Sequence, residues 1–191
     1  MRIAIGHTYT KFLKLMQNDS ELNSKFIIFP RFFDNKKKLI KRDYKSYIYD
    51  VWRLRNVIEY AIYPDYVREE LPLPKHIKYI YVIHELEKDA DAFFRLREKF
   101  YLIAGYASGE KYRDYTLQEF MQTFRDTEKW YLGISTKREL KEAVLNRFDY
   151  ADITTMLLGS FKDLRDYNYV KRKMIELYHV VQGLEKQTIL F

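Results

Sequence analysis

The stretch WYLGISTKRELKEAVLNRFDYAD, residues 130–152, decides the fold because it contains one complete strand–helix–strand unit. The apolar run 130–134 predicts a strand that ends in small residues. The spacing Thr136-x-x-Glu139 is that of a capping box, in which both side chains bond free amides at a helix start. Apolar residues then recur on one helical face: Leu140, Ala143, Val144 and Phe148. Residues 150–155 begin the next strand, with Asp152 near its end.

The same design occurs just upstream. Residues 100–107 predict a strand, and Thr116-x-x-Glu119 repeats the capping box. The helix that follows turns one set of apolar residues inward: Leu117, Phe120, Met121 and Phe124. Two successive strand-then-helix units predict parallel strands joined by crossover helices.

The remaining chain continues this alternation. Apolar runs predict four further strands, at 2–6, 25–29, 57–63 and 77–83. Further helices are predicted after a Thr8 cap, at 47–54, at 88–99 and finally at 168–183. Seven strands, nearly all followed by helices, predict an α/β fold: a compact or incomplete (β/α) TIM-like barrel with a C-terminal helix, in a single domain over residues 1–191. A doubly wound open sheet is the alternative.

Composition narrows the class of protein. The chain has 191 residues, of which 47% are hydrophobic and 32% charged, which is typical of a globular domain. The absence of cysteine excludes disulfides and thiolate zinc sites, and we expect neither a metal nor a cofactor. No apolar stretch reaches the roughly 18 residues of a membrane span, and no signal-peptide pattern is present, so we expect no membrane partner and a cytoplasmic location.

The formal net charge of +7 favours a polyanionic partner such as nucleic acid. Basic residues concentrate in the segment 35–45, which reads either as a solvated loop or as an arm that contacts phosphates. A second basic group opens the helix after residue 136, with the same two interpretations. The candidate phosphate contacts are Lys36, Lys37, Lys38, Lys41, Arg42, Lys137 and Arg138.

Chemically capable residues follow the predicted strands. Both candidate architectures place the active site at the carboxyl ends of parallel strands. The residues expected at that edge are His7, Asp65, His84, residues 105–108, residues 133–135 and Asp152. We therefore predict one pocket there, although each residue also has a plain structural interpretation as a cap, a turn or a packing position.

Three spaced motifs carry a family resemblance. YLIAGYASGE, residues 101–110, is similar to a glycine-rich strand end of the guanine transglycosylases, with Ala104 in place of the first glycine. Residues 131–135, the pair Ala143–Val144 and the strand end at Asp152 follow in the family's order. Over about residues 57–155 the chain thus resembles the tRNA-guanine transglycosylase superfamily, including phage proteins that insert deazaguanines into DNA.

The resemblance implies base exchange in DNA or tRNA through a covalent aspartyl-glycosyl intermediate, with guanine or 7-deazaguanine as the base. It implies that Asp152 is the nucleophile and that Asp65 recognises the base. Gly105, Tyr106, Ala107 and Gly133 would lie against the base, and His84 and His7 would line the pocket. Family members often dimerise, so the resemblance is also compatible with a homodimer or a larger complex.

Several family features are absent from this sequence. The Asp-Ser-Gly-Gly motif that carries the general base is not evident in the N-terminal third, and Ile153-Thr154-Thr155 replaces a Pro-Thr-Arg. The cysteine-containing zinc site is missing, and the chain is about half the usual length. A catalytically degenerate barrel that serves as a nucleic-acid or purine-binding subunit is therefore the alternative to an enzyme. A hydrolase that removes a base would use the same carboxylates.

Overall fold

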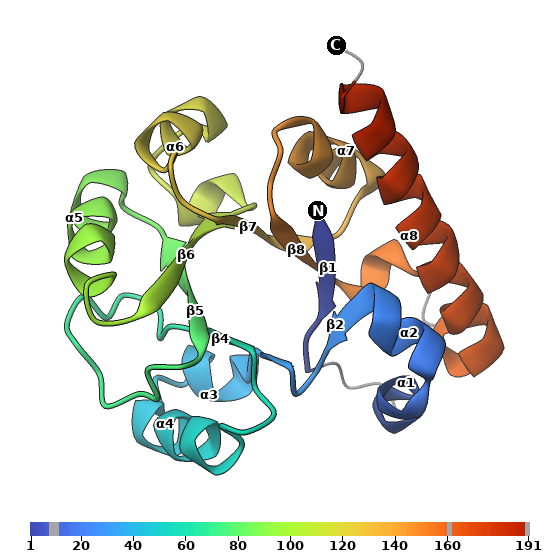
Figure 1. The fold of residues 1–191 in the computed structure, drawn as a ribbon, viewed down its shortest axis with the longest axis horizontal. Coiled ribbons are helices and arrows are strands. Elements are labelled where there is room, and N and C mark those ends of the chain that lie inside the picture. Colours follow the sequence, from blue (N-terminus) through green and yellow to red (C-terminus); the bar gives the residue numbers. More distant parts are fainter. Residues whose placement is uncertain (8–11, 160–161, 190–191) are drawn as a thin grey trace.

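The computed structural model describes residues 1–7, 12–159 and 162–189, and its centre is a barrel-shaped parallel sheet ringed by helices (Figure 1). The sheet has eight strands in the order β2-β1-β8-β7-β6-β5-β4-β3. The strands are β1 Arg2–Ile5, β2 Phe26–Ile28, β3 Phe32–Phe33, β4 Tyr60–Ile62, β5 Lys78–Ile83, β6 Tyr101–Ala107, β7 Lys129–Ile134 and β8 Tyr150–Ile153. The predicted TIM-like (β/α) barrel is confirmed.

The two ends of the sheet, β2 and β3, are consecutive in sequence. Residues 29–31 join them: Phe29 N donates to Ile5 O on the β1 side at 2.8 Å, and Arg31 O accepts from Tyr60 N on the β4 side at 2.9 Å. One extended segment therefore pairs first with β1 and then with β4, so the chain itself nearly closes the ring. The prediction of seven strands missed β3, because Pro30 interrupts the stretch that holds β2 and β3.

The helices are α1 Leu13–Asn18, α2 Ser20–Lys25, α3 Lys36–Ile40, α4 Tyr44–Arg53, α5 Leu86–Leu96, α6 Leu117–Thr123, α7 Lys137–Leu145 and α8 Tyr167–Ile189. Both predicted capping boxes form, at Thr116 and Thr136. Helix α8 packs on α7 and α2 along one side of the barrel (Figure 1). The predicted Thr8 cap lies outside the described residues.

Three local predictions were wrong. The segment 35–45 is not a loop, as one of its two interpretations had it, but holds α3, which Asn35 caps by accepting from Lys38 N. Helix α4 begins at Tyr44 rather than at residue 47, because Asp43 caps it. The strand predicted at 57–63 is limited to β4, since residues 54–57 form a turn in which Val57 N bonds Leu54 O.

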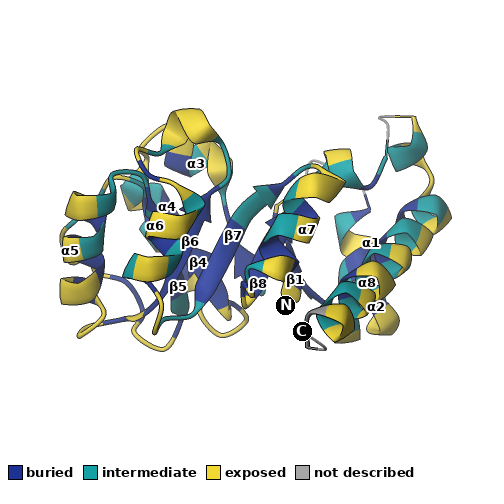
Figure 2. Ribbon diagram, turned by 90° about the horizontal axis from the view of Figure 1, so that it is seen from above, coloured by how far each residue is buried: buried dark blue, intermediate teal, exposed yellow. Residues whose placement is uncertain are grey.

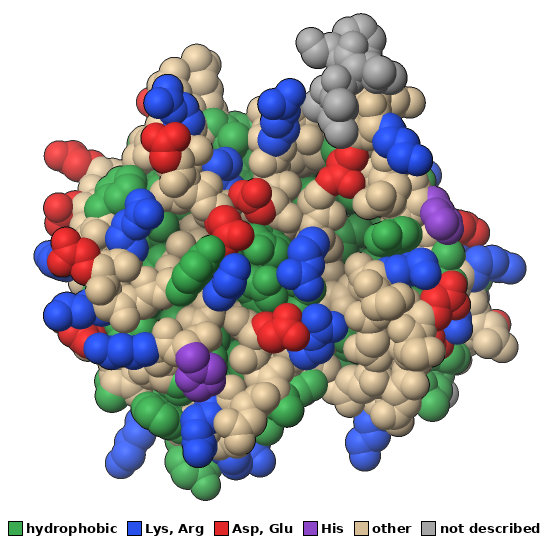
Figure 3. All heavy atoms as spheres, in the orientation of Figure 1, with side chains coloured by type: hydrophobic (Ala, Val, Ile, Leu, Met, Phe, Trp, Pro, Cys, Tyr) green, Lys and Arg blue, Asp and Glu red, His purple; other side chains and the backbone are tan. Residues whose placement is uncertain are grey.

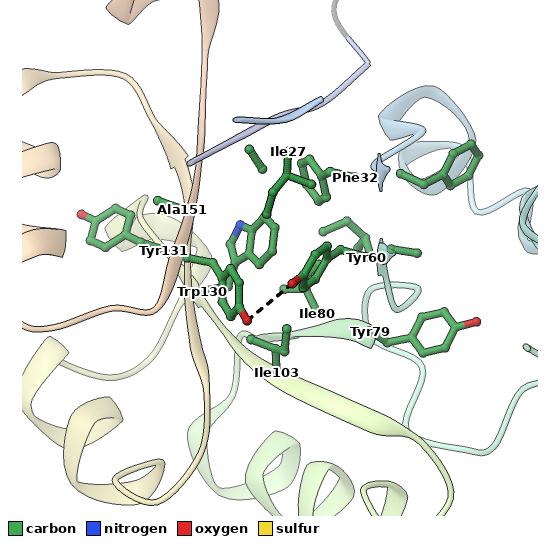
Figure 4. Packing of buried hydrophobic residues seen from close by; sticks show 14 of the residues in the cluster. Ile27, Phe32, Tyr60, Tyr79, Ile80, Ile103, Trp130, Tyr131 and Ala151 are labelled. Atoms are coloured by element: carbon green, nitrogen blue, oxygen red, sulfur yellow. Dashed lines mark hydrogen bonds between the residues drawn. The ribbon is translucent and has the colours of Figure 1, made fainter. Parts of the chain in front are cut away.

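Aromatic side chains fill the barrel interior (Figure 4). Trp130 is fully buried, and its ring centroid lies 4.9 Å from that of Phe32, 5.6 Å from Tyr60 and 5.3 Å from Tyr150. Side chains alternate across a strand, so residues two positions beyond interior ones also point inward. The alternation places an aspartate beyond Phe32 and another beyond Tyr150, one layer closer to the C-terminal ends of the strands.

A polar network covers the N-terminal end of the barrel. Arg2 Nη1 donates to Tyr60 OH at 3.0 Å, and Tyr150 OH donates to Glu128 Oε1 at 3.0 Å. Lys78 Nζ donates to the other oxygen of Glu128 at 3.4 Å. Figure 3 shows the molecule from this end, with side chains of opposite charge interleaved near the middle. The charged side chains at this end bond one another and the tyrosines of the barrel interior, so we assign them a structural role.

Gly105 packs inside the barrel wall. An added Cβ would lie 2.8 Å from Ile80 Cγ2 and 3.1 Å from the carbonyl oxygen of Tyr81. We expect Gly105→Ala to destabilise the fold by about 1–3 kcal/mol, because the neighbouring backbone cannot retreat. Urea unfolding measures the effect. Gly183→Ala is the control, because no atom lies within 4 Å of a Cβ there and alanine favours the helix; equal stability of the two variants would contradict the prediction.

Candidate active site at the C-terminal mouth

Two buried aspartates lie at the C-terminal mouth of the barrel. Asp152 lies in β8 and Asp34 directly follows β3, and each is only 3% exposed. Asp152 Oδ1 accepts hydrogen bonds from Trp130 Nε1 at 3.0 Å and from Gly133 N at 3.1 Å. Gly133 has a φ of +68°, which only glycine adopts easily, and the β7–β8 register shifts at this point. The glycine thus turns its amide toward the carboxylate.

Asp34 is held over the end of β1. The amide of His7 donates to Asp34 Oδ1, and a Cβ on Gly6 would lie 2.1 Å from Oδ2, so only glycine leaves room for this carboxylate. Lys36 Nζ lies 4.0 Å from Oδ2. Burial, with a smaller contribution from Asp152, raises the pKa of Asp34 to about 7, although the His7 amide and Lys36 act to lower it. One carboxyl of the pair is therefore suited to carry a proton near neutral pH.

Asp65 and His84 form a second cluster, at the ends of β4 and β5. His84 Nε2 lies 4.0 Å from Asp65 Oδ2, and the ring of Tyr66 stacks on the imidazole at 4.3 Å. The carbonyl oxygen of Tyr112 lies 2.8 Å from His84 Nδ1 and can only accept, so Nδ1 carries a hydrogen. Burial raises the pKa of Asp65, Asp89 adds to this, and His84 opposes it.

Asp34 links the two clusters. Tyr47 OH, at the buried end of α4, donates to Ile62 O at 2.7 Å. Tyr47 OH also lies 3.3 Å from the carbonyl oxygen of Phe33, the residue before Asp34. Burial raises the pKa of this phenol, and Asp34 and Asp65 add to the effect. Around the barrel, the stretch that holds β2 and β3 lies between β1, which pairs with β8, and β4. Asp34 therefore stands between Asp152 and Asp65. The predicted acids lie on non-adjacent strands, and the residue that connects them was not predicted.

Polar atoms without partners gather at the same end. Among the described residues, three buried side-chain atoms lack a hydrogen-bond partner: Asp65 Oδ1, His84 Nε2 and Thr154 Oγ1. They follow β4, β5 and β8 respectively. Buried polar groups are normally paired, so a ligand that bonds these atoms would complete the site.

A buried acid fixes the position of His84. Asp89, in α5, accepts with Oδ2 from the amides of His84 and Glu85, both at 2.8 Å. Its other oxygen accepts from Arg68 Nε at 2.7 Å. Asp89, and Glu85 through its bond to Arg68 Nη2 at 2.7 Å, thus have structural roles. In the described part of the chain, no group of three His, Asp or Glu side chains is placed to hold a metal.

The remaining predicted site residues divide between the mouth and its surroundings. Gly105 contacts Ile80 and Leu132 inside the barrel wall, beneath the mouth. Tyr106 points outward, toward Phe120 at 5.2 Å, and lines a groove of about 1040 Å³ between α6 and α7. Ala107, the last residue of β6, is buried, whereas His7 is exposed beside the Asp34 carboxylate.

The basic residues take different roles. Lys38 is structural, since its Nζ bonds Asp50 at 2.6 Å and Ser46 O at 3.1 Å and so ties α3 to α4. The others are exposed around the mouth: Lys36, Lys37, Lys41, Arg42, Lys137 and Arg138. Figure 2 places α3 at the end of the barrel opposite both labelled chain ends.

The fold and the site define a TIM-like barrel with paired acids at its C-terminal mouth. The chain is 40% identical over 176 residues to the uncharacterized protein ORF192 of Acidianus two-tailed virus, an alignment that covers 90% of this chain and 91% of the viral protein. It therefore belongs to the ORF192 family. No protein-family model and no solved structure matches it. None of its described helices has the length and apolar character needed to cross a bilayer.

Proposed function

We propose that this protein is a guanine transglycosylase-like enzyme that exchanges a base in DNA or tRNA through a covalent aspartyl-glycosyl intermediate. The observation that carries the proposal is the Asp34–Asp152 pair. Its two carboxyls occupy different environments: Asp152 Oδ1 accepts from two N–H donors, whereas Asp34 accepts from one backbone amide and its pKa is raised by burial. Substitution at a glycosidic carbon uses two such carboxyls, one as the nucleophile and one as the proton donor.

In this mechanism Asp152 attacks the glycosidic carbon and forms a bond to it, while the bond to the departing base breaks. Protonated Asp34 gives its proton to that base. The incoming base then attacks the same carbon, its proton passes to Asp34, and the aspartyl ester breaks. The protonation states of both residues are restored, and no other reactant is consumed.

Asp65 and His84 are the proposed base-recognition residues. The carboxylate of Asp65 accepts hydrogen bonds from the amino edge of a guanine-like base, as acidic side chains do elsewhere. The unpartnered His84 Nε2 and the ring of Tyr66 lie beside it. The target nucleotide leaves its stack to reach the mouth, and exposed cations nearby bind the phosphates. Such a substrate places the reaction in the cytoplasm.

The proposal is tested by incubating the protein with labelled guanine or a labelled 7-deazaguanine and either duplex DNA or tRNA. We expect label in the nucleic acid, together with a protein–nucleic acid adduct that survives denaturing electrophoresis. Guanine binding without incorporation into either polymer would instead favour a binding subunit, homodimeric or within a larger complex. The near-complete burial of both acids is the observation that favours this second function.

Asp65→Asn should weaken guanine binding by about tenfold to a hundredfold, because one acceptor of a charged hydrogen bond becomes a donor. Isothermal titration with guanine measures the change. Glu69→Gln is the control, as its side chain is exposed on the same loop. Identical affinities for wild type and Asp65→Asn would remove Asp65 from base recognition.

A further inference from the structure

Two apolar side chains project from the segments that follow the paired acids. Among the described residues, Ile40 and Met156 are the most exposed of the large hydrophobic residues, at 81% and 75%. Ile40 ends α3, shortly after Asp34, and Met156 lies in the 3-10 helix η2, Thr155–Leu157, shortly after Asp152. A single exposed apolar residue is ordinary, but these two follow β3 and β8, the strands that lead to the paired acids, at the same end of the barrel.

Both side chains stand on anchored supports. Leu39, next to Ile40, is buried, and the Lys38–Asp50 bond ties α3 to α4. On the other side, Leu158 is buried and Thr154 N donates to Ile134 O at 2.8 Å. The neighbouring bonds and buried residues therefore hold the side chains of Ile40 and Met156 in their exposed positions.

The charge around Ile40 indicates what it meets. Exposed cations surround it: Lys36, Lys37, Lys41 and Arg42. Within the described chain no carboxylate forms an ion pair with Lys37, Lys41 or Arg42, and the net charge of the protein is +7. One apolar tip among cations offers too little apolar area for a hydrophobic protein partner. It suits a nucleic acid, in which phosphates attract the cations and base faces accept the apolar group.

We infer that Ile40 and Met156 are wedges that enter a base-paired nucleic acid on either side of the target nucleotide and fill the space that this nucleotide leaves. The inference rests on the proposed function, in which a base must leave its stack to reach Asp152. The wedges offset the lost stacking, and the cations hold the flanking phosphates. Substituting the wedges should therefore impair extrusion more than binding.

The test uses a duplex DNA and an RNA hairpin, each with one 2-aminopurine in the stem, whose fluorescence rises when the base unstacks. The wild-type protein should bind at least one probe and raise its fluorescence. Ile40→Ala and Met156→Ala should each lose most of that rise while binding within about threefold of wild type, because phosphate contacts set the affinity. Val180→Ala, an exposed apolar residue on α8, should behave as wild type.

Wild-type-like fluorescence in both wedge variants overturns the inference, as does a wild-type protein that binds neither probe or binds without any rise. The labelled-guanine assay distinguishes a failure of the proposed function from a failure of the wedge inference. If wild type extrudes the base, the wedge variants do not, and no label is incorporated, the wedges stand and base exchange fails. If label is incorporated equally by wild type and both wedge variants, base exchange stands and the wedges fail.

Discussion

Asp152→Asn is expected to abolish base exchange, lowering its rate by about a thousandfold or more. An amide is a far weaker nucleophile than a carboxylate, so the glycosyl–enzyme bond cannot form. The fold should survive, since the side chain keeps its shape and its oxygen can still accept from Trp130 Nε1 and Gly133 N. Label incorporation and adduct formation should disappear together, while the circular dichroism spectrum of the variant matches that of wild type.

Asp126→Asn is the matched control for this substitution, because its side chain is 85% exposed and lies just before β7, at the opposite end of the barrel from the mouth. It should incorporate label at the wild-type rate. A folded Asp152→Asn protein that exchanges bases as fast as this control would end the assignment of Asp152 as nucleophile. If neither variant nor wild type incorporates label although wild type binds guanine, the result favours the binding-subunit alternative.

Local signals explain why much of the fold could be predicted from sequence. Thr116 and Thr136 mark their helix starts unambiguously, because a capping box depends on two residues three positions apart. The buried parallel strands are continuous apolar runs, which is the pattern expected when helices cover a sheet. Helix α3 was missed because it buries only Leu39, so it has no apolar stripe to detect.

The site was harder to predict because its central residue depends on a long-range connection. Asp34 follows a two-residue strand beyond Pro30, which had ended the predicted strand. Its proximity to Asp152 exists only because residues 26–33 cross from β1 to β4. The one available signal was the sequence Phe32-Phe33-Asp34, an apolar pair that ends in an acid like the other strand ends. Asp65, His84 and Asp152 could be predicted as strand-end residues, but the order of the acids across the mouth could not.

Asp34→Asn should remove a pH-dependent loss of stability. The folded-state pKa of Asp34 is raised to about 7 from 3.8, so the folded protein holds this proton where the unfolded chain has released it. As the pH rises from about 4 to about 7, this group lowers the free energy of unfolding. The loss is complete above pH 7 and is absent below about pH 4. Three pKa units correspond to about 4 kcal/mol.

Asparagine cannot ionise, so the variant should be more stable than wild type at pH 8, by as much as about 4 kcal/mol, and close to wild type at pH 4. Urea unfolding of both proteins across this pH range measures the difference in the free energy of unfolding. Taking the difference cancels the contributions of the other titrating groups, and Asp126→Asn should follow wild type throughout.

The Asp34→Asn variant should also exchange bases slowly, because no proton reaches the leaving base. A variant that gains stability while it loses activity is expected of a carboxyl kept buried for its chemistry. A constant stability difference from pH 4 to pH 8 would show that Asp34 does not titrate in this window, and it would remove the proton donor from the mechanism.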